Sequence, residues 1–131
     1  MAEPINPAEL PSIPGVSQAM IGDGRLLVWI SGQVAVDESG RIVGHDDAES
    51  QARQCLANID AVLKLAGASR SDVVKLGVFL IDIADRPAVA RARAAFFGDH
   101  APASTLVEVS GLVDPALRVE IEAVAIVTKG D

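Results

Sequence analysis

The sequence predicts an α+β fold in which two helices lie on one face of a mixed β-sheet. Two local patterns predict it: short apolar runs bounded by glycine and aspartate are typical of strands, and two longer segments repeat their apolar residues at helical spacing. The chain has 131 residues, half of them hydrophobic, which suffices for one core and argues against wholesale disorder. We therefore expect a single domain over residues 1–131.

The first third of the chain is predicted to form strands behind an extended arm. Four of the seven prolines lie in residues 1–14, which favours an extended segment over a helix or an inner strand. Strands are then expected at 16–21, 26–31 and 34–36, with 41–43 as a candidate return strand of the last hairpin. Turn signals such as Gly22-Asp23-Gly24 separate these runs.

The middle of the chain predicts two helices. Asp46 or Asp47 can cap the first, and Gly67 ends it. Its apolar stripe, from which Gln51 stands apart, consists of Ala52, Cys55, Leu56, Ile59, Leu63 and Ala66. The second helix is expected to begin near Asp85 and to end at Gly98. It should bury Val89, Ala92 and Phe96 and expose Arg86, Arg91 and Arg93.

Three further strands are predicted, over residues 73–83, 104–109 and 117–127. They are apolar on both sides, so a single layer of helices would leave one sheet face uncovered. A second copy of the chain is the simplest cover for such a face, because a large exposed apolar sheet is a liability in a monomer.

Charge and composition exclude several classes of partner. Eleven basic against eighteen acidic residues and few aromatic ones argue against nucleic acid. No apolar run approaches the roughly 20 residues of a membrane helix, and the N-terminus lacks a secretory pattern, so we expect a cytoplasmic protein and no membrane contact. Metal and nucleotide motifs are absent, and Cys55, His45 and His100 are interpreted as structural residues.

The last predicted strand carries the most informative polar pattern. Alternation places Arg118, Glu120 and Glu122 on the face opposite Leu117, Val119, Ile121 and Ala123. If residues 104–109 pair with this strand in a hairpin centred near 112–114, Ser104 and Leu106 share the face of the carboxylates. Crowded carboxylates can work as a general acid and base. The alternative is a solvated face with a ladder of arginine and glutamate.

Three motifs stand out along the chain: Ile-Ser-Gly-Gln-Val at 30–34, Pro-Ala-Ser-Thr-Leu-Val-Glu-Val at 102–109 and Val-Glu-Ile-Glu-Ala at 119–123. In this order and spacing they resemble the RidA (YjgF) family over roughly residues 13–127. The resemblance implies a chorismate-mutase-like homotrimer with a barrel-like centre and a small-ligand cleft at each subunit interface. It also implies hydrolysis of reactive enamines or imines to a carbonyl compound and ammonia, with no metal or organic cofactor.

The same resemblance assigns roles to individual residues. Glu120 matches the family's pocket glutamate, which positions or activates water, and Gly32 matches the glycine whose backbone borders the ligand. Ser104 stands where the family has an arginine that binds the substrate carboxylate, and Val16 stands where it has a pocket tyrosine. Leu106 replaces a smaller or polar residue, so the pocket should be less cationic and more apolar.

Two hypotheses remain open from the sequence. In the first, the protein is a cofactor-free deaminase of altered specificity, with Thr105 adding a polar contact and Arg118 a candidate substitute for the missing cation. In the second, it is a non-catalytic trimer that binds a small metabolite or regulates a partner. Ribonuclease activity is the weakest interpretation, because the chain is acidic and has neither tyrosine nor paired histidines.

Overall fold

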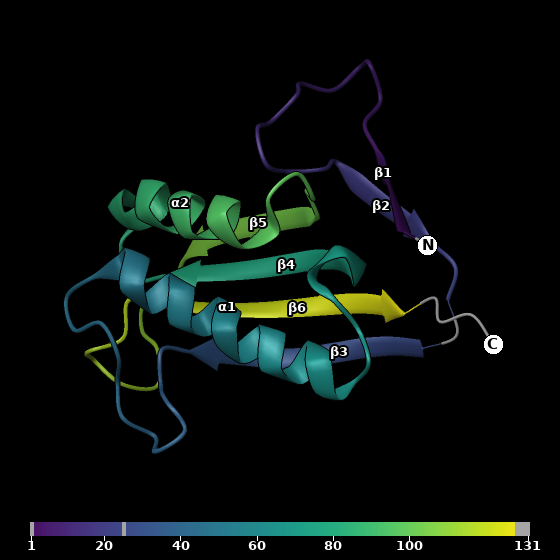
Figure 1. The fold of residues 1–131 in the computed structure, drawn as a ribbon. Coiled ribbons are helices and arrows are strands. Elements are labelled where there is room, and N and C mark those ends of the chain that lie inside the picture. Colours follow the sequence, from purple (N-terminus) through teal and green to yellow (C-terminus); the bar gives the residue numbers. More distant parts are fainter. Residues whose placement is uncertain (1, 25, 128–131) are drawn as a thin grey trace.

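The computed structural model describes residues 2–24 and 26–127, which form a mixed sheet with helices on one side (Figure 1). The strands are β1 (Ala2–Ile5), β2 (Ala19–Gly22), β3 (Leu26–Val34), β4 (Val73–Leu80), β5 (Ala103–Glu108) and β6 (Val119–Val127). The helices are α1 (Ala48–Leu65) and α2 (Arg86–Phe97), with 3₁₀ turns η1 (Arg70–Asp72) and η2 (Ile83–Asp85). The predicted α+β class, with both helices on one sheet face, is confirmed.

The four-stranded sheet has the order β3-β6-β4-β5. Strand β6 runs antiparallel to both of its neighbours, whereas β4 and β5 are parallel. Parallel neighbours need a crossover, and α2 supplies it between β4 and β5. The predicted hairpin between 104–109 and 117–127 is therefore wrong, since residues 109–118 lead from the sheet edge past β4 to the centre.

Strand boundaries differ from the expected ones most clearly at three places, besides β2 and β6, which begin at Ala19 and Val119 and not at residues 16 and 117. The two strands expected at 26–31 and 34–36 are one strand, β3, whose register with β6 shifts between Ile30 and Gln33. Part of the proline-rich arm forms β1, which pairs with β2 in a separate two-stranded ribbon. Strand β4 ends at Leu80, and Ile83 already belongs to η2. The return segment 41–43 does meet Val36, through a bridge to Ile42.

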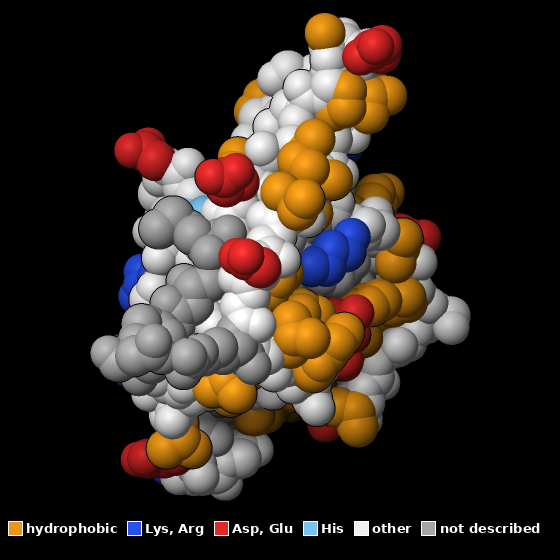
Figure 2. Space-filling view, turned by 90° about the vertical axis from the view of Figure 1, so that its right-hand side faces the viewer, with side chains coloured by type: hydrophobic (Ala, Val, Ile, Leu, Met, Phe, Trp, Pro, Cys, Tyr) orange, Lys and Arg blue, Asp and Glu red, His pale blue; other side chains and the backbone are white. Residues whose placement is uncertain are grey.

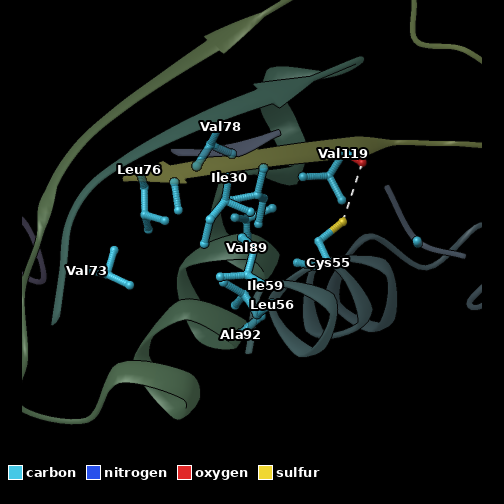
Figure 3. Packing of buried hydrophobic residues seen from close by; sticks show 14 of the residues in the cluster. Ile30, Cys55, Leu56, Ile59, Val73, Leu76, Val78, Val89, Ala92 and Val119 are labelled. Carbon is cyan, nitrogen blue, oxygen red and sulfur yellow. Dashed lines mark hydrogen bonds between the residues drawn. The ribbon is translucent and has the colours of Figure 1, made fainter. Parts of the chain in front are cut away.

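Helix α1 is capped as its sequence predicts and packs its apolar stripe on the sheet. The Asp47 side chain accepts hydrogen bonds from the backbone N–H groups of the first turn, and Gly67, with φ +75°, follows the C-cap. Cys55 is buried in the core, and its Sγ lies 3.8 Å from the backbone oxygen of Val119 on β6 (Figure 3).

A buried glutamine fixes the point at which β6 begins. Gln51, expected outside the apolar stripe, is fully buried. Its Nε2 donates to the backbone oxygens of Gly44 (3.2 Å) and Ala116 (3.0 Å), and its Oε1 accepts from the N–H of Arg118 (2.7 Å). The Arg118 guanidinium binds Asp85 at 2.8 Å and 2.9 Å. Together these contacts hold the chain two residues before Glu120.

Helix α2 buries Val89 and Ala92, as predicted; Phe96 is partly buried against the core, and Phe97, which was not predicted to be buried, is buried as well. The two rings pack edge to face, with their centroids 4.8 Å apart. Of the arginines expected in solvent, Arg91 pairs with Glu49 on α1 at 2.7 Å. Arg93 is only partly exposed, which the sequence pattern does not predict.

Candidate functional site

The sheet face turned away from the helices, called the open face below, carries the two carboxylates of β6. Glu120 and Glu122 lie on it, while Val119, Ile121 and Ala123 point into the core under the helices. Apolar side chains of neighbouring strands are exposed there: Leu27 by 56%, Trp29 by 74% and Val107 by 42%. Within the described residues, both helices cover the opposite face (Figure 1).

Seen from the right-hand side of Figure 1, the surface shows hydrophobic side chains gathered beside basic and acidic groups (Figure 2). The side chain of Lys75, which lies on the open face, is held by its neighbour, because its Nζ donates to Thr105 Oγ1 at 2.7 Å. The open face thus combines apolar side chains with a small number of polar ones, such as the hydrogen-bonded Lys75 and Thr105. This combination is typical of sites for small organic ligands.

Each carboxylate of the open face lies over a glycine. A Cβ built on Gly32 would stand 2.0 Å from Glu120 Oε2, and one on Gly77 would stand 2.8 Å from Glu122 Oε2. The two glutamates are alternate residues of one strand, so their Cβ atoms are roughly 7 Å apart. Within the described residues, neither carboxylate forms a hydrogen bond or an ion pair. Both are therefore free to accept a proton or a hydrogen bond from a ligand or water.

Two shallow hollows flank Glu122. One, of about 350 Å³, is lined by Phe79, both carboxylates and residues of the 109–113 segment. The other, of about 300 Å³, lies between Trp29, Lys75 and Gly77. Glu120 reaches only the first hollow, where the Phe79 ring and the loop form apolar walls. A carboxylate beside such walls can orient or deprotonate a water molecule next to a small substrate.

A third hollow, called the edge groove below, lies on the helix side of the sheet at the β5 edge. It measures about 530 Å³, and its walls include Val16, Ile83, Arg86, Arg93, Ser104 and Leu106. Ser104 and Leu106 pair with Leu76 and Val78 of β4, which places them on the helix side. Residues 13–17 form one wall of the groove, and the Ser17 N–H donates to the Pro102 backbone oxygen at 3.2 Å, which holds this segment beside the start of β5.

The structure therefore divides the predicted site residues into two sets on opposite faces. Glu120, Gly32 and Thr105 belong to the open face. Val16, Ser104 and Leu106 line the edge groove, and the parallel pairing of β5 with β4 accounts for the positions of Ser104 and Leu106. A small ligand of one chain cannot touch both sets, because the sheet lies between them. Arg118 belongs to neither set, since Asp85 holds its guanidinium.

Sequence reasoning missed two arginines of the edge groove. Arg86, Ala90 and Arg93 line it together, because positions i, i+4 and i+7 share one helix face. That spacing is legible in the sequence, but it does not reveal that this face of α2 meets an edge strand. Burial, followed by the charge of Arg86, lowers the pKa of Arg93 below its usual range.

Cys55 and His100, two further titratable residues, have roles in packing and hydrogen bonding within the fold. Burial, reinforced by the charge of Glu120, raises the pKa of the Cys55 thiol to about 12, so it is a neutral core side chain. The His100 ring lies 2.6 Å from the Val73 backbone oxygen. Residues 2–24 and 26–127 contain no cluster of potential ligands suited to a metal ion. No described helix has the length and apolar character needed to cross a bilayer.

The sequence was compared with protein families and with individual proteins, and both comparisons found relatives. The family model described as Endoribonuclease L-PSP matches residues 8–127. The chain is 40% identical to the 3-aminoacrylate deaminase RutC of Acinetobacter baylyi, over 76% of this chain and 78% of that protein. It is 39% identical to a 2-iminobutanoate/2-iminopropanoate deaminase of Salmonella typhimurium, over 76% and 79% of the two chains.

Among solved structures, YyfB of Yersinia pestis, a protein of unknown function of the conserved Rid family, superimposes with a TM-score of 0.88. It is 36% identical, and the match covers 96% of this chain and 98% of the other. A match of this extent takes in nearly all of the described helices and strands.

Proposed function

The chain belongs to the Endoribonuclease L-PSP family, also called the RidA (YjgF) family, and on that premise we propose that it hydrolyses a reactive imine or enamine. Two relatives bear the names of deaminases that act on such compounds. The observation that carries the proposal is the unpaired Glu120 carboxylate over the bare backbone of Gly32, in the motif that the resemblance assigns to water activation.

The proposed reaction needs only water and a properly placed base. Glu120 accepts a proton from a water molecule as its oxygen attacks the imine carbon, and the imine nitrogen gains a proton. The resulting amino alcohol then expels ammonia, so that imine and water become a carbonyl compound and ammonia. An enamine enters the same route after its carbon is protonated to give the imine. The step uses neither an oxidant nor a reductant.

We propose that the working form is a homotrimer with the ligand at subunit interfaces. Two observations support it: the open face exposes a large apolar area that a neighbouring sheet would cover, and Glu120 and Ser104 lie on opposite faces of one chain. A neighbouring subunit could bring its Glu120 toward the edge groove of the first. The resemblance to a family of trimers with interfacial clefts agrees with this arrangement.

Position 104 is proposed to contribute less to binding a substrate carboxylate than it does in the family's best-known members. Ser104 provides one hydroxyl where they have an arginine fork, and the walls at Val16 and Leu106 are apolar. Losing a hydrogen bond to a charged partner weakens binding by about 10- to 100-fold. A deaminase with this pocket should therefore favour other imines, unless another cation takes the place of the missing one.

The decisive experiment compares Glu120→Gln with the wild-type protein on imines generated in solution, with ammonia release and semicarbazide trapping as readouts. We expect a fall in kcat of about 100-fold or more, because general base catalysis contributes 10²–10⁴-fold. Glu122→Gln tests whether the two carboxylates act as a pair, and Glu38→Gln, on an exposed turn, is the matched control. Unchanged turnover in Glu120→Gln, at unchanged mass in solution, contradicts the proposal.

The second candidate function is binding without catalysis, as a small-metabolite-binding or regulatory trimer. Ser104 and Val16 favour it, because the two side chains that grip substrate in well-known relatives are absent from these positions. Failure of the wild-type protein to hydrolyse any imine, with or without a carboxylate, would favour this candidate. The acidic net charge of −7 continues to argue against RNA as substrate.

A further inference from the structure

The edge groove brings together two cations that no acidic side chain neutralises. Arg86 and Arg93 are the only arginines in the described part of the chain whose side chains form neither a hydrogen bond nor an ion pair. The others bind carboxylates, among them Arg91 with Glu49 and Arg118 with Asp85. In a protein with a net charge of −7, two unpaired arginines facing one hollow call for an explanation.

Helix geometry places Arg86 and Arg93 on the same wall of the groove. Arg86 and Arg93 lie two turns apart on one face of α2, and the small side chain of Ala90 between them leaves the space open. Arg93 also lies against the arm, since a Cβ added at Gly15 would stand 3.5 Å from its Nη2. Arg93 is half-buried between the helix and this segment, whereas Arg86 at the start of the helix is exposed.

Like charges in a partly buried hollow are unfavourable unless an anion joins them. Burial, followed by the proximity of Arg86, lowers the pKa of Arg93, which indicates that the folded chain itself does not compensate this charge. A bound anion would remove the repulsion and engage the guanidinium fork.

A buried hydroxyl in the wall of the groove is a second indication of a bound ligand. Ser104 Oγ is shielded from solvent and has no hydrogen-bond partner within the described residues. Leaving a buried hydroxyl unpaired is costly, and folded proteins rarely do so without a reason. Ser104 lines the same groove as Arg93, so a change of its side-chain rotamer would bring the hydroxyl to an acceptor atom of a ligand there.

We propose that the edge groove binds the carboxylate of a small organic acid, with Arg93 as its fixed cation, Arg86 as a second cation and Ser104 Oγ as a hydrogen-bond donor. Val16, Ile83 and Leu106 supply apolar contacts for a short carbon chain. A volume of about 530 Å³ suits a ligand of this size. One half-buried guanidinium among apolar walls matches a monoanion with two oxygens better than a more highly charged phosphate.

That this acid is the imine or enamine substrate itself rests on the proposed function, whereas the binding of a carboxylate does not. If the acid is the substrate, Arg93 on α2 replaces the arginine that relatives have at the position of Ser104 on β5. The protein would then still act on substrates that carry a carboxylate. Arg118 is not available for this role while Asp85 holds it.

The test is a binding measurement by calorimetry with 2-oxobutanoate, a stable keto acid, and with butan-2-one, its uncharged analogue. The wild-type protein should bind the keto acid at least tenfold more tightly than the ketone. Arg93→Met should weaken keto acid binding by about 10- to 100-fold, and Ser104→Ala by about 2- to 10-fold. Arg91→Met, on the same helix but paired with Glu49 outside the groove, is the matched control and should bind as the wild type does.

The result that overturns the proposal is keto acid affinity unchanged in Arg93→Met, or equal affinity for the ketone. Inorganic phosphate binding more tightly than the keto acid would overturn the carboxylate assignment. Arg93→Lys serves as a second variant, which keeps the charge and should bind more tightly than Arg93→Met. Arg93-dependent binding in a protein that hydrolyses no imine would uphold this site and refute the proposed function, so the two failures are distinguishable.

Discussion

Replacing Gly32 with alanine isolates the contribution of the Glu120 carboxylate without removing any charge. The new Cβ would stand 2.0 Å from Oε2, 2.8 Å from Cδ and 3.0 Å from Cγ of Glu120. Van der Waals contact requires the carboxylate oxygen to move by at least about 1.2 Å. Gly32 is not among the residues with positive φ, so the backbone itself accepts alanine.

The expected cost falls on activity rather than on stability. The atoms that must move belong to the end of a flexible side chain, and alanine in a strand recovers about 0.5–1 kcal/mol of backbone entropy relative to glycine. We therefore expect the free energy of unfolding to change by less than about 1 kcal/mol. A displacement of about 1 Å at a catalytic group can reduce the rate 100-fold, so kcat should fall by that order.

Gly77→Ala is the matched control, because its Cβ would stand 2.8 Å from Glu122 Oε2 and displace that carboxylate. The assay is ammonia release from an imine generated in solution, together with thermal unfolding of both variants. Gly32→Ala should lose activity and Gly77→Ala should retain most of it. The reasoning is refuted if both variants hydrolyse the imine at the wild-type rate, or if Gly77→Ala alone is impaired.

Two further predictions concern buried groups. Ser104→Ala should raise the free energy of unfolding by about 1 kcal/mol, seen as a melting temperature several degrees higher, because it removes an unpaired buried hydroxyl; a lower melting temperature would contradict the assignment of Ser104 to ligand binding. The raised pKa of Cys55, about 12 when folded against 9.0 as the reference, should cost stability as pH rises from 9 toward 12, by about 1.4 kcal/mol per pH unit. Comparing unfolding in urea of wild type and Cys55→Ala across this range checks it, and parallel pH curves would contradict it.

Local patterns in the sequence determined the helices and the alternation of β6. The stripe through Ala52, Cys55 and Ile59 is buried under α1, and the carboxylates at Glu120 and Glu122 share one sheet face, as expected. These features follow from fixed periods of about 3.6 and 2 residues, which depend on neighbouring residues alone. The family could also be predicted from the sequence, because its motifs are short and contiguous.

The partner of β5 was decided only by the tertiary structure. Residues 104–109 have the same alternation whether they pair antiparallel with β6 or parallel with β4, so the sequence pattern fits both. The α2 crossover selects the parallel pairing and moves Ser104 and Leu106 to the side of the sheet opposite Glu120. A strand–helix–strand succession is the one sequence signal that favours this arrangement.

The environment of Arg93 also came from the tertiary structure. On helical spacing alone, Arg86, Arg91 and Arg93 are equally solvated, and nothing local separates the arginine that meets Glu49 from the one beside Ser104. Gln51 shows the same limit, since its burial serves backbone groups of residues 44, 116 and 118 that are distant in sequence. Periodicity states which residues share a face, whereas what that face meets depends on contacts between distant segments.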